Sequence, residues 1–399
     1  MKLLIIGGDR QPIPPIHGGA VENLVKIFYE ENEETENEIS VVGCEDSKLN
    51  LTKENVYKKC RFYTAKKSEN KHKLFAFFTR VVAKILKIQI LNKTEYPQNI
   101  IDAIENNKIE FDTIIVENYI NAIVPLHKKY PNKKIFFHIH NDKLNNKLFG
   151  CKEIVNSCYR IITVSDYIKN RVCTIPNAKN KTYTLINSID VKKFGKENYS
   201  KSLKKNLGIK DDETVIIFAG RISKTKGIKE LIQALARIKN EKFKLVVVGN
   251  SWYGTTNYKD SFFEEVKQLS KEIEDKIIFT GYIDYNDIPK YYAIADISIV
   301  PSIWQEPCSL ALFESMASEL LLITTNTGGT PEVVKDNAII LDVNKNFVNN
   351  LSDEIKNAIS DKKIVKNYSK KAHEYIQYYN PKRYYCEFVN ILERGKNND

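Results

Sequence analysis

The chain has 399 residues and the overall composition of a globular protein, with a net charge of +11. This length suits two domains of roughly 150–200 residues better than a single core. The seven cysteines form no C-x-x-C pair, which argues against a disulfide framework or a zinc site. The odd, scattered set is typical of reduced cytosolic thiols, so we expect a cytoplasmic protein. No run approaches the ~18 apolar residues of a membrane span, so we expect no membrane-spanning segment.

The positive charge is concentrated in one segment. Residues 58–93 hold eleven Lys or Arg and a single acid, Glu69. Over residues 73–88 the apolar side chains follow one helix face and basic ones lie opposite. Such a helix can lie in an anionic membrane interface and place the protein on the inner face of the membrane. The residues concerned are Lys73, Phe77, Phe78, Arg80, Lys84 and Lys87.

Two alternatives bear on this basic segment. An ordinary helix packed on its own domain would show the same pattern of side chains. A nucleic-acid-binding surface is disfavoured, because the segment lacks interleaved base-stacking aromatic residues in a recognisable module. The segment therefore points to an acceptor at a membrane surface, such as a lipid-linked glycan precursor, and to no nucleic acid.

Short apolar runs alternate with helical patterns along the chain, which is typical of parallel sheets with crossover helices. After the first strand comes a helix over 20–29. The first series of strands is expected at 2–6, 39–43, 113–117, 134–139, 161–164 and 182–186. The second series has a helix over 228–239 and strands at 214–218, 244–248, 276–279, 297–300, 321–324 and 338–341.

The two series predict an α/β protein of two Rossmann-like domains with a cleft between them. The first domain is expected over residues 1–190 and the second over 191–379. A carboxy-terminal helix over about 380–399 is expected to pack back on the first domain. Residues 190–213 are polar and rich in Lys and Asn, which is typical of a linker.

Two glycine-rich loops follow predicted strands, where helix N-termini offer N–H groups to phosphate. Gly18 and Gly19 precede the first helix, although a plain tight turn would look the same. Gly220 ends a strand, and Arg221 and Lys226 follow in the loop. Two fixed cations there can neutralise a leaving diphosphate. The alternative is a solvated basic turn.

Two glutamates mark the segment 301–319. Glu306 lies in a loop, and Glu314 lies about two turns along the helix that follows, within an apolar run. A carboxylate in such a place can accept hydrogen bonds from the vicinal hydroxyls of a sugar or a ribose. A solvated helix face is a poor explanation for Glu314, because its neighbours are apolar.

These motifs occur in a specific order and spacing. Gly220-Arg221, Lys226-Gly227, the Glu306 and Glu314 pair, and 327–332 (Thr-Gly-Gly-Thr-Pro-Glu) together resemble the donor domain of the family-four retaining glycosyltransferases, which have the GT-B fold. Comparable patterns in the amino-terminal half extend the resemblance over essentially the whole chain: Gly18-Gly19, 138–142 (His-Ile-His-Asn-Asp), 163–165 and 187–194.

The resemblance implies a retaining transfer of a sugar from a nucleotide diphosphate-sugar, most simply a UDP-sugar, to a glycan or lipid-linked glycan. It implies that Arg221 and Lys226 hold the diphosphate, with Gly18 and Gly19 contributing from the other domain. It assigns the ribose to Glu314 and the reaction centre to His140, unless His138 or His140 is a core residue. The remaining donor contacts that it implies are Tyr282 and Ile283 near the base, and Glu306, Pro307, Cys308, Ser309 and Leu310 near the transferred sugar.

Two further features qualify the resemblance, and alternative functions stay open. The sequence contains no D-x-D triplet, so we expect no metal and no cofactor beyond the co-substrate. Glu319 stands where the family usually has glycine, which should change how the Glu314 helix ends. The alternatives are a GT-B epimerase or phosphorylase, or a non-catalytic nucleotide-sugar binding module.

Overall fold

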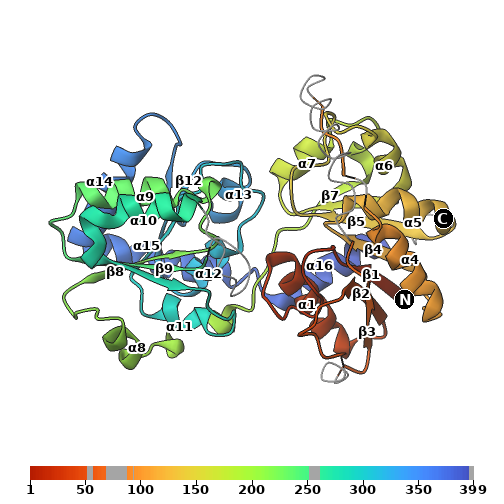
Figure 1. Cartoon of the computed structure of the whole chain (residues 1–399), viewed down its shortest axis with the longest axis horizontal. Coiled ribbons are helices and arrows are strands. Elements are labelled where there is room, and N and C mark those ends of the chain that lie inside the picture. Colours follow the sequence, from red (N-terminus) through yellow and green to blue (C-terminus); the bar gives the residue numbers. More distant parts are fainter. Residues whose placement is uncertain (52–56, 69–87, 93, 251–260, 395–399) are drawn as a thin grey trace. The chain divides into compact units, whose positions relative to one another are not determined.

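The computed structural model describes residues 1–51, 57–68, 88–92, 94–250 and 261–394. The chain divides into two compact units, Met1–Asn187 with Pro381–Asp399, and Ser188–Asn380 (Figure 1). The predicted basic helix, with Lys73, Phe77, Phe78, Arg80, Lys84 and Lys87, lies outside the described residues, so its membrane contact stays a prediction. Within the described ranges, no helix combines the length and apolarity needed to cross a bilayer.

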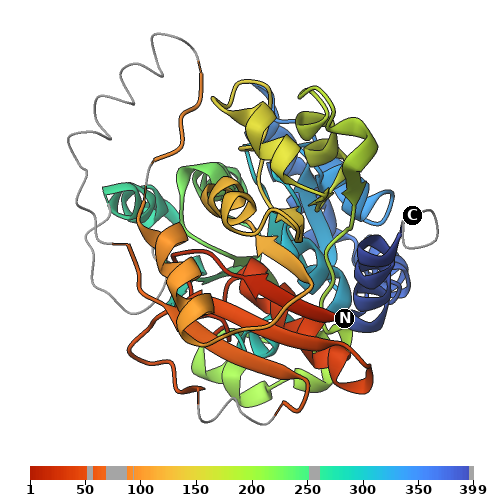
Figure 2. The ribbon, with the colours of Figure 1, turned by 90° about the vertical axis from the view of Figure 1, so that its right-hand side faces the viewer.

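The first unit is built on a seven-stranded parallel sheet of order β3-β2-β1-β4-β5-β6-β7 (Figure 2). Its strands are β1 (Lys2–Ile6), β2 (Glu38–Cys44), β3 (Cys60–Ala65), β4 (Thr113–Glu117), β5 (Lys134–Ile139), β6 (Arg160–Thr163) and β7 (Thr182–Thr184). Its helices are α1 (Ala20–Glu31), α4 (Tyr96–Asn106), α5 (Ile123–Lys129), α6 (Cys151–Ser157), α7 (Asp166–Val172) and α16 (Pro381–Glu393), with short turns η1 (Asn32–Glu34), η2 (Ile120–Ala122) and η3 (Lys179–Lys181).

Both faces of this sheet are covered, which explains why its central strands β1, β4 and β5 consist mainly of apolar residues. Leu3 and Ile5 face the core that includes α1 and α16, and Ile115 and Phe136 face the same core. On β4 and β5 the residues two positions further along, Glu117 and His138, therefore lie on this face as well. Two ionisable side chains thus continue the rows of buried apolar residues at the ends of β4 and β5.

The helix α16 packs against α1 although the rest of the chain separates them (Figure 1). Phe388 is 1% exposed and its ring centroid lies 4.8 Å from that of Phe28. The hydroxyl of Tyr385 donates to Asn32 Oδ1 at 2.8 Å. The buried guanidinium of Arg160 donates to the carbonyls near the end of α16. The last described helix is therefore part of the core of the first unit.

The second unit repeats the plan with a six-stranded parallel sheet of order β10-β9-β8-β11-β12-β13. Its strands are β8 (Thr214–Ala219), β9 (Phe243–Val248), β10 (Ile277–Gly281), β11 (Ile297–Val300), β12 (Leu321–Thr325) and β13 (Ile339–Leu341). Its helices are α8 (Lys201–Asn206), α9 (Ile228–Arg237), α10 (Ser261–Ser270), α11 (Ile288–Ala293), α12 (Leu310–Ala317), α13 (Thr330–Val334), α14 (Phe347–Ser360) and α15 (Lys362–Ile376), with turns η4 (Val191–Phe194), η5 (Lys196–Asn198), η6 (Lys224–Lys226) and η7 (Lys271–Lys276).

The interpretation of residues 190–213 as a linker is wrong. The segment belongs to the second unit and contains η4, η5 and α8. Phe194 is fully buried and its ring lies 5.9 Å from that of Tyr292. The polar composition reflects the exposed faces of these short elements, while a few apolar residues anchor them.

The end of α12 also differs from expectation. Glu319 adopts the left-handed conformation, with φ of 56°, that glycine usually takes at this position. The amide of Leu320 donates to the carbonyl of Ser315 at 3.3 Å, and that of Glu319 to Met316 at 3.3 Å. The helix thus ends as a glycine-capped helix would, at a strain cost of about 1–2 kcal/mol. The predicted change in its ending is wrong.

Each sheet has a switch point, where the strand order reverses at the first strand of the unit. In the first unit β1 lies between β2 and β4, and in the second β8 lies between β9 and β11. Loops after the strands at such a switch point diverge and leave room for a ligand. Ligands are therefore expected at the carboxyl ends of β8 and β11 in the second unit, and of β1 and β4 in the first.

Candidate functional site

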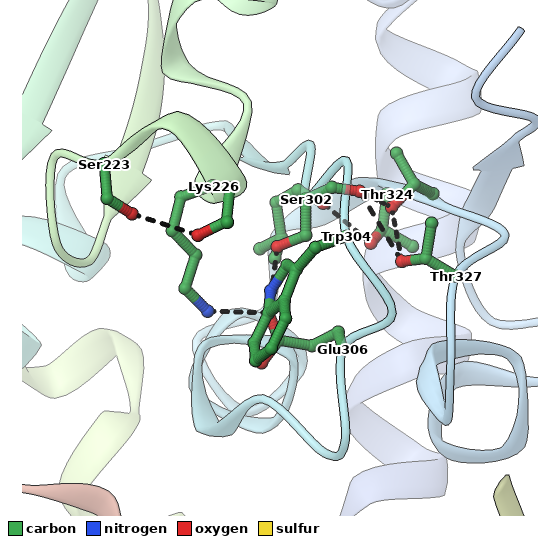
Figure 3. Close-up of polar contacts among 10 residues, drawn as sticks. Ser223, Lys226, Ser302, Trp304, Glu306, Thr324 and Thr327 are labelled. Carbon is green, nitrogen blue, oxygen red and sulfur yellow. Dashed lines mark hydrogen bonds and ion pairs between the residues drawn. The ribbon is translucent and has the colours of Figure 1, made fainter. Parts of the chain in front are cut away.

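Four side chains meet at the switch point of the second unit (Figure 3). Lys226, at the end of η6 after β8, places Nζ 2.6 Å from Glu306 Oε2. The same carboxylate oxygen accepts from Trp304 Nε1 at 2.9 Å and from Ser302 Oγ at 3.0 Å. The Glu306 side chain is 7% exposed and that of Lys226 is 19% exposed. A buried carboxylate thus receives three donors on one oxygen, which fixes its orientation.

Two glycines let the loops that carry these side chains approach closely. A Cβ on Gly227, which has φ of 72°, would lie 1.8 Å from the carbonyl oxygen of Pro301. A Cβ on Gly328, with φ of 55°, would lie 2.2 Å from the carbonyl oxygen of Glu306. The neighbouring Gly329 amide donates to that carbonyl at 2.8 Å. The glycines of the motifs are therefore required by the backbone around Glu306.

The second carboxylate oxygen of Glu306, Oε1, receives no hydrogen bond from the residues that the structure describes. This oxygen can accept a hydroxyl of a bound sugar. Pro307 and Cys308 after it are buried, and Ser309 caps α12 without a side-chain hydrogen bond. The first N–H groups of α12, beginning at Leu310, can therefore serve an anion.

The other predicted donor residues of this unit also lie beyond strand ends. Gly220 and Arg221 follow β8, and both are exposed. Tyr282 and Ile283 follow β10 and are half-buried. Because the strands are parallel, these positions share one edge of the sheet with Lys226 and Glu306. Their roles as ligands of a donor stay predictions.

Glu314 lies just over one turn into α12, rather than the two turns expected, and is 7% exposed. The hydroxyl of Tyr292 donates to its Oε2 at 3.1 Å. Burial raises the pKa of Glu314 to about 7, and hydrogen bonds from Tyr292 and Tyr285 offset this only in part. In the free protein this carboxyl is thus poised between its two protonation states near neutral pH.

In the first unit, Gly18 and Gly19 precede α1 with φ of 75° and 119°. The carboxyl of Glu22 lies against Gly19, 2.2 Å from where a Cβ would stand. Burial raises the pKa of Glu22 to about 7. A Gly19 side chain would collide with Glu22, and a phosphate at this helix start would meet a carboxyl that is about half protonated at neutral pH.

His138 and His140 lie on one face of the sheet, at and just beyond the end of β5, together with a residue that sequence reasoning missed. Glu117, the last residue of β4, places Oε2 3.0 Å from His138 Nδ1 and 3.1 Å from His140 Nε2. These atoms form the one cluster among the described residues with metal-ligand spacing. A charged residue ending the run Thr-Ile-Ile-Val-Glu was the signal that could have revealed it.

Comparison with known proteins identifies the family of this chain. A family model described as Glycosyl transferases group 1 matches residues 200–375. A putative glycosyltransferase of Bacillus subtilis, YtcC, is 31% identical over 280 residues, which cover 67% of this chain and 68% of that protein. The chain belongs to the glycosyl transferases group 1 family. It is therefore a glycosyltransferase, and the family resemblance inferred from its motifs is confirmed.

One further relative and one solved structure are similar to this glycosyltransferase. Lipopolysaccharide 1,2-N-acetylglucosaminetransferase of Salmonella typhimurium is 28% identical over 273 residues, covering 65% of this chain and 67% of that protein. The crystal structure of Anabaena HepE with UDP and glucose superposes with a TM-score of 0.73 over 99% of this chain and 100% of that one, at 18% identity. This glycosyltransferase has the GT-B fold of two Rossmann-like units, as predicted.

Proposed function

We propose that this glycosyltransferase transfers a sugar, with retention of anomeric configuration, from a UDP-sugar to a glycan or lipid-linked glycan acceptor, without a divalent metal. The single observation that carries the proposal is the Lys226–Glu306 contact of 2.6 Å at the switch point of the second unit. It sets a cation for phosphate and an acceptor for sugar hydroxyls side by side, as a nucleotide sugar requires.

The charges of this site support cleavage of a nucleotide sugar. Lys226 has further N–H groups besides the one directed at Glu306, and Arg221 lies in the same loop after β8. Both cations stabilise the negative charge that develops on the leaving diphosphate. Glu306 Oε1 accepts a hydroxyl of the transferred sugar and thereby orients its ring. With two protein cations at the leaving group and no D-x-D motif, the reaction does not require a metal clamp.

The retention that we propose rests on the resemblance to the retaining family. The absence of a suitable nucleophile among the proposed contacts favours a front-face route over a double displacement. Glu314 is assigned to the ribose, and Glu306 is held by three donors on one oxygen. In a front-face transfer the bond to the leaving phosphate breaks while the acceptor hydroxyl bonds to the same face of the anomeric carbon. The phosphate oxygen takes the acceptor's proton. His140 is proposed to contact the transferred sugar.

The donor and acceptor classes follow from chemistry and from the relatives. HepE is described with UDP and glucose bound, and the Salmonella relative is named as acting on lipopolysaccharide. A UDP-sugar donor and a glycan or lipid-linked acceptor are therefore proposed for this chain. A thermal-shift screen against UDP-, GDP- and ADP-sugars identifies the donor, because a ligand that binds the folded state raises its stability.

The stereochemistry and metal dependence of transfer test the proposal. With the donor from the screen, the anomeric proton of the product should show the configuration of the donor by NMR. Turnover in EDTA should match turnover in buffer without chelator. An inverted product, or activity lost in EDTA and restored by manganese, would contradict the proposal. Epimerised sugar without transfer, or cleavage by phosphate, would indicate the alternative classes.

We expect donor affinity to depend on pH through Glu314. Its carboxyl, with a pKa of about 7, must be ionised to accept two ribose hydroxyls. Affinity for the nucleotide sugar should therefore be full above pH 7 and fall as the pH decreases, about tenfold between pH 8 and pH 6. Titration calorimetry at several pH values measures this change in affinity. The nucleotide sugar itself does not titrate between pH 6 and pH 8.

Two variants complete this test. Glu314→Gln should bind the nucleotide sugar more weakly, and its affinity should not change between pH 6 and pH 8, because the amide does not ionise. Glu272→Gln, at an exposed position of the same unit, should keep the wild-type change in affinity. A change in affinity that persists in Glu314→Gln would mean that another group controls donor binding.

A further inference from the structure

Three side chains converge at the carboxyl ends of β4 and β5. The parallel register pairs Glu117 with His138, and His140 lies two residues further on the same face. His138 Nδ1 and His140 Nε2 lie 3.0 and 3.1 Å from Glu117 Oε2, and 3.2 Å from each other. The side chains are 4%, 0% and 7% exposed for Glu117, His138 and His140. Because all three side chains are buried, hydrogen bonds among them must determine where their protons lie.

The hydrogen-bond partners indicate where the protons lie. An ionised carboxylate only accepts, so both short contacts with Glu117 need a proton on the facing nitrogen. His138 then carries its proton on Nδ1, and its buried Nε2, which has no partner among the described residues, holds only a lone pair. The reverse arrangement would bury an unpaired N–H on a ring whose centroid lies 5.3 Å from that of Phe388, and an unpaired buried N–H is costly.

The same reasoning disfavours a metal ion at the cluster. The three facing atoms have a spacing that could hold one. A metal on Nδ1 of His138 would leave the proton on Nε2, where the described residues offer no acceptor. Histidines that ligate metals almost always donate their second N–H to a partner. Hydrogen bonds to Glu117 satisfy the cluster without that penalty.

We propose that Glu117 is a positioning residue, which holds His140 with its proton on Nε2 so that Nδ1 offers a lone pair to a sugar hydroxyl. No described residue donates a hydrogen bond to that Nδ1. The inference rests on the proposed function, in which His140 contacts the transferred sugar. It assigns to His140 the role of hydrogen-bond acceptor, whereas an imidazolium could only donate.

Backbone contacts and charge reinforce this arrangement. Asn118 has φ of 53°, and its Oδ1 accepts from the His140 amide at 3.1 Å and from Asn141 Nδ2 at 2.6 Å. The strand end that carries His140 is thereby fixed. Burial, aided by His138, lowers the pKa of His140 to about 4, so the ring is neutral at physiological pH. Although burial opposes it, the two imidazoles lower the pKa of Glu117 to about 2.

The tautomer can be measured directly in the full-length enzyme. Protein labelled with ¹⁵N-histidine should show His140 protonated on Nε2, with its signals assigned by their loss in His140→Asn. In Glu117→Gln, whose side chain can itself donate to Nε2, the proton of His140 should shift to Nδ1. A wild-type His140 protonated on Nδ1 overturns the proposal, even if the variant does not fold.

Kinetics provide the second readout. Glu117→Gln should lower kcat by roughly 10- to 100-fold, with the KM for the donor changed less than about threefold. Glu110→Gln, an exposed glutamate just before β4, should match wild type. Wild-type kcat in a folded Glu117→Gln would overturn the positioning role. If His140 shows the expected tautomer but His140→Ala keeps full activity, the proposed role of His140 in transfer is refuted instead.

Metal analysis of the purified enzyme tests the remaining alternative. Equimolar zinc, released by chelator with a change in the His140 signals, would replace this proposal with a metal site.

Discussion

Lys226→Ala is expected to lower turnover by on the order of 10²-fold or more, the usual effect of losing one charge partner of the transition state. Lys226 forms an ion pair with the buried carboxylate of Glu306 at 2.6 Å. Its loss removes positive charge from the leaving group. Among the residues that the structure describes, it leaves the Glu306 carboxylate with the two neutral donors Ser302 and Trp304. Steady-state kinetics with saturating donor measure the effect.

A matched control separates this effect from a general loss of lysine charge. Lys229 lies three residues further along and pairs with Glu265 at 2.7 Å on the exposed surface of the unit. Lys229→Ala should retain wild-type turnover, because exposed ion pairs contribute little. Melting of both variants by circular dichroism reports whether they fold. A folded Lys226→Ala enzyme within about threefold of wild-type turnover would show that the donor binds elsewhere.

Phe388→Ala is expected to destabilise the first unit by about 3–5 kcal/mol, the usual cost of truncating a buried phenylalanine. Phe388 is 1% exposed and packs on Phe28 at 4.8 Å and on the ring of His138 at 5.3 Å. The cavity would lie between α16 and the sheet that carries His138. Hydrogen exchange detected by mass spectrometry reads each unit separately, which a single melting curve of a two-domain chain does not.

The expected exchange pattern is specific to one unit. Amides in β4 and β5 should exchange faster, while those of β8 and β11 keep wild-type protection. Cys386→Ala, at an exposed position of the same helix, should leave both patterns unchanged. Equal acceleration in both units would show that α16 supports the whole chain rather than the first core.

The strands were the most predictable part of the molecule, because both faces of each sheet are covered and most of the strands are apolar runs. The strand β3, Cys60–Ala65, was not predicted, and its alternating residues lie in the basic segment. Its signal was weaker because an edge strand with partly exposed side chains needs fewer apolar residues. The linker assignment failed for a related reason, since composition alone does not separate a surface helix from a loop.

The donor motifs could be located from sequence, but their contacts could not. Trp304 and Glu306 are two residues apart, whereas Lys226 is 80 positions away and meets them only because β8 and β11 are neighbours in the sheet. Likewise, Glu117 meets His138 through the register of β4 and β5, which sequence alone does not give. Glu319 took the conformation of the missing glycine because the surrounding turn bonds outweigh a modest backbone cost.

The position of α16 has a consequence for how the protein is made. Synthesis proceeds from the amino terminus, so residues 188–380 leave the ribosome before the helix that completes the first unit. At about 5–20 residues per second this interval lasts roughly 10–40 s. Until then Phe28 and the face of the sheet that carries His138 lack their cover. The unit that begins first in the chain is thus the one that finishes folding last, and it is the one exposed to chaperones and proteases during translation.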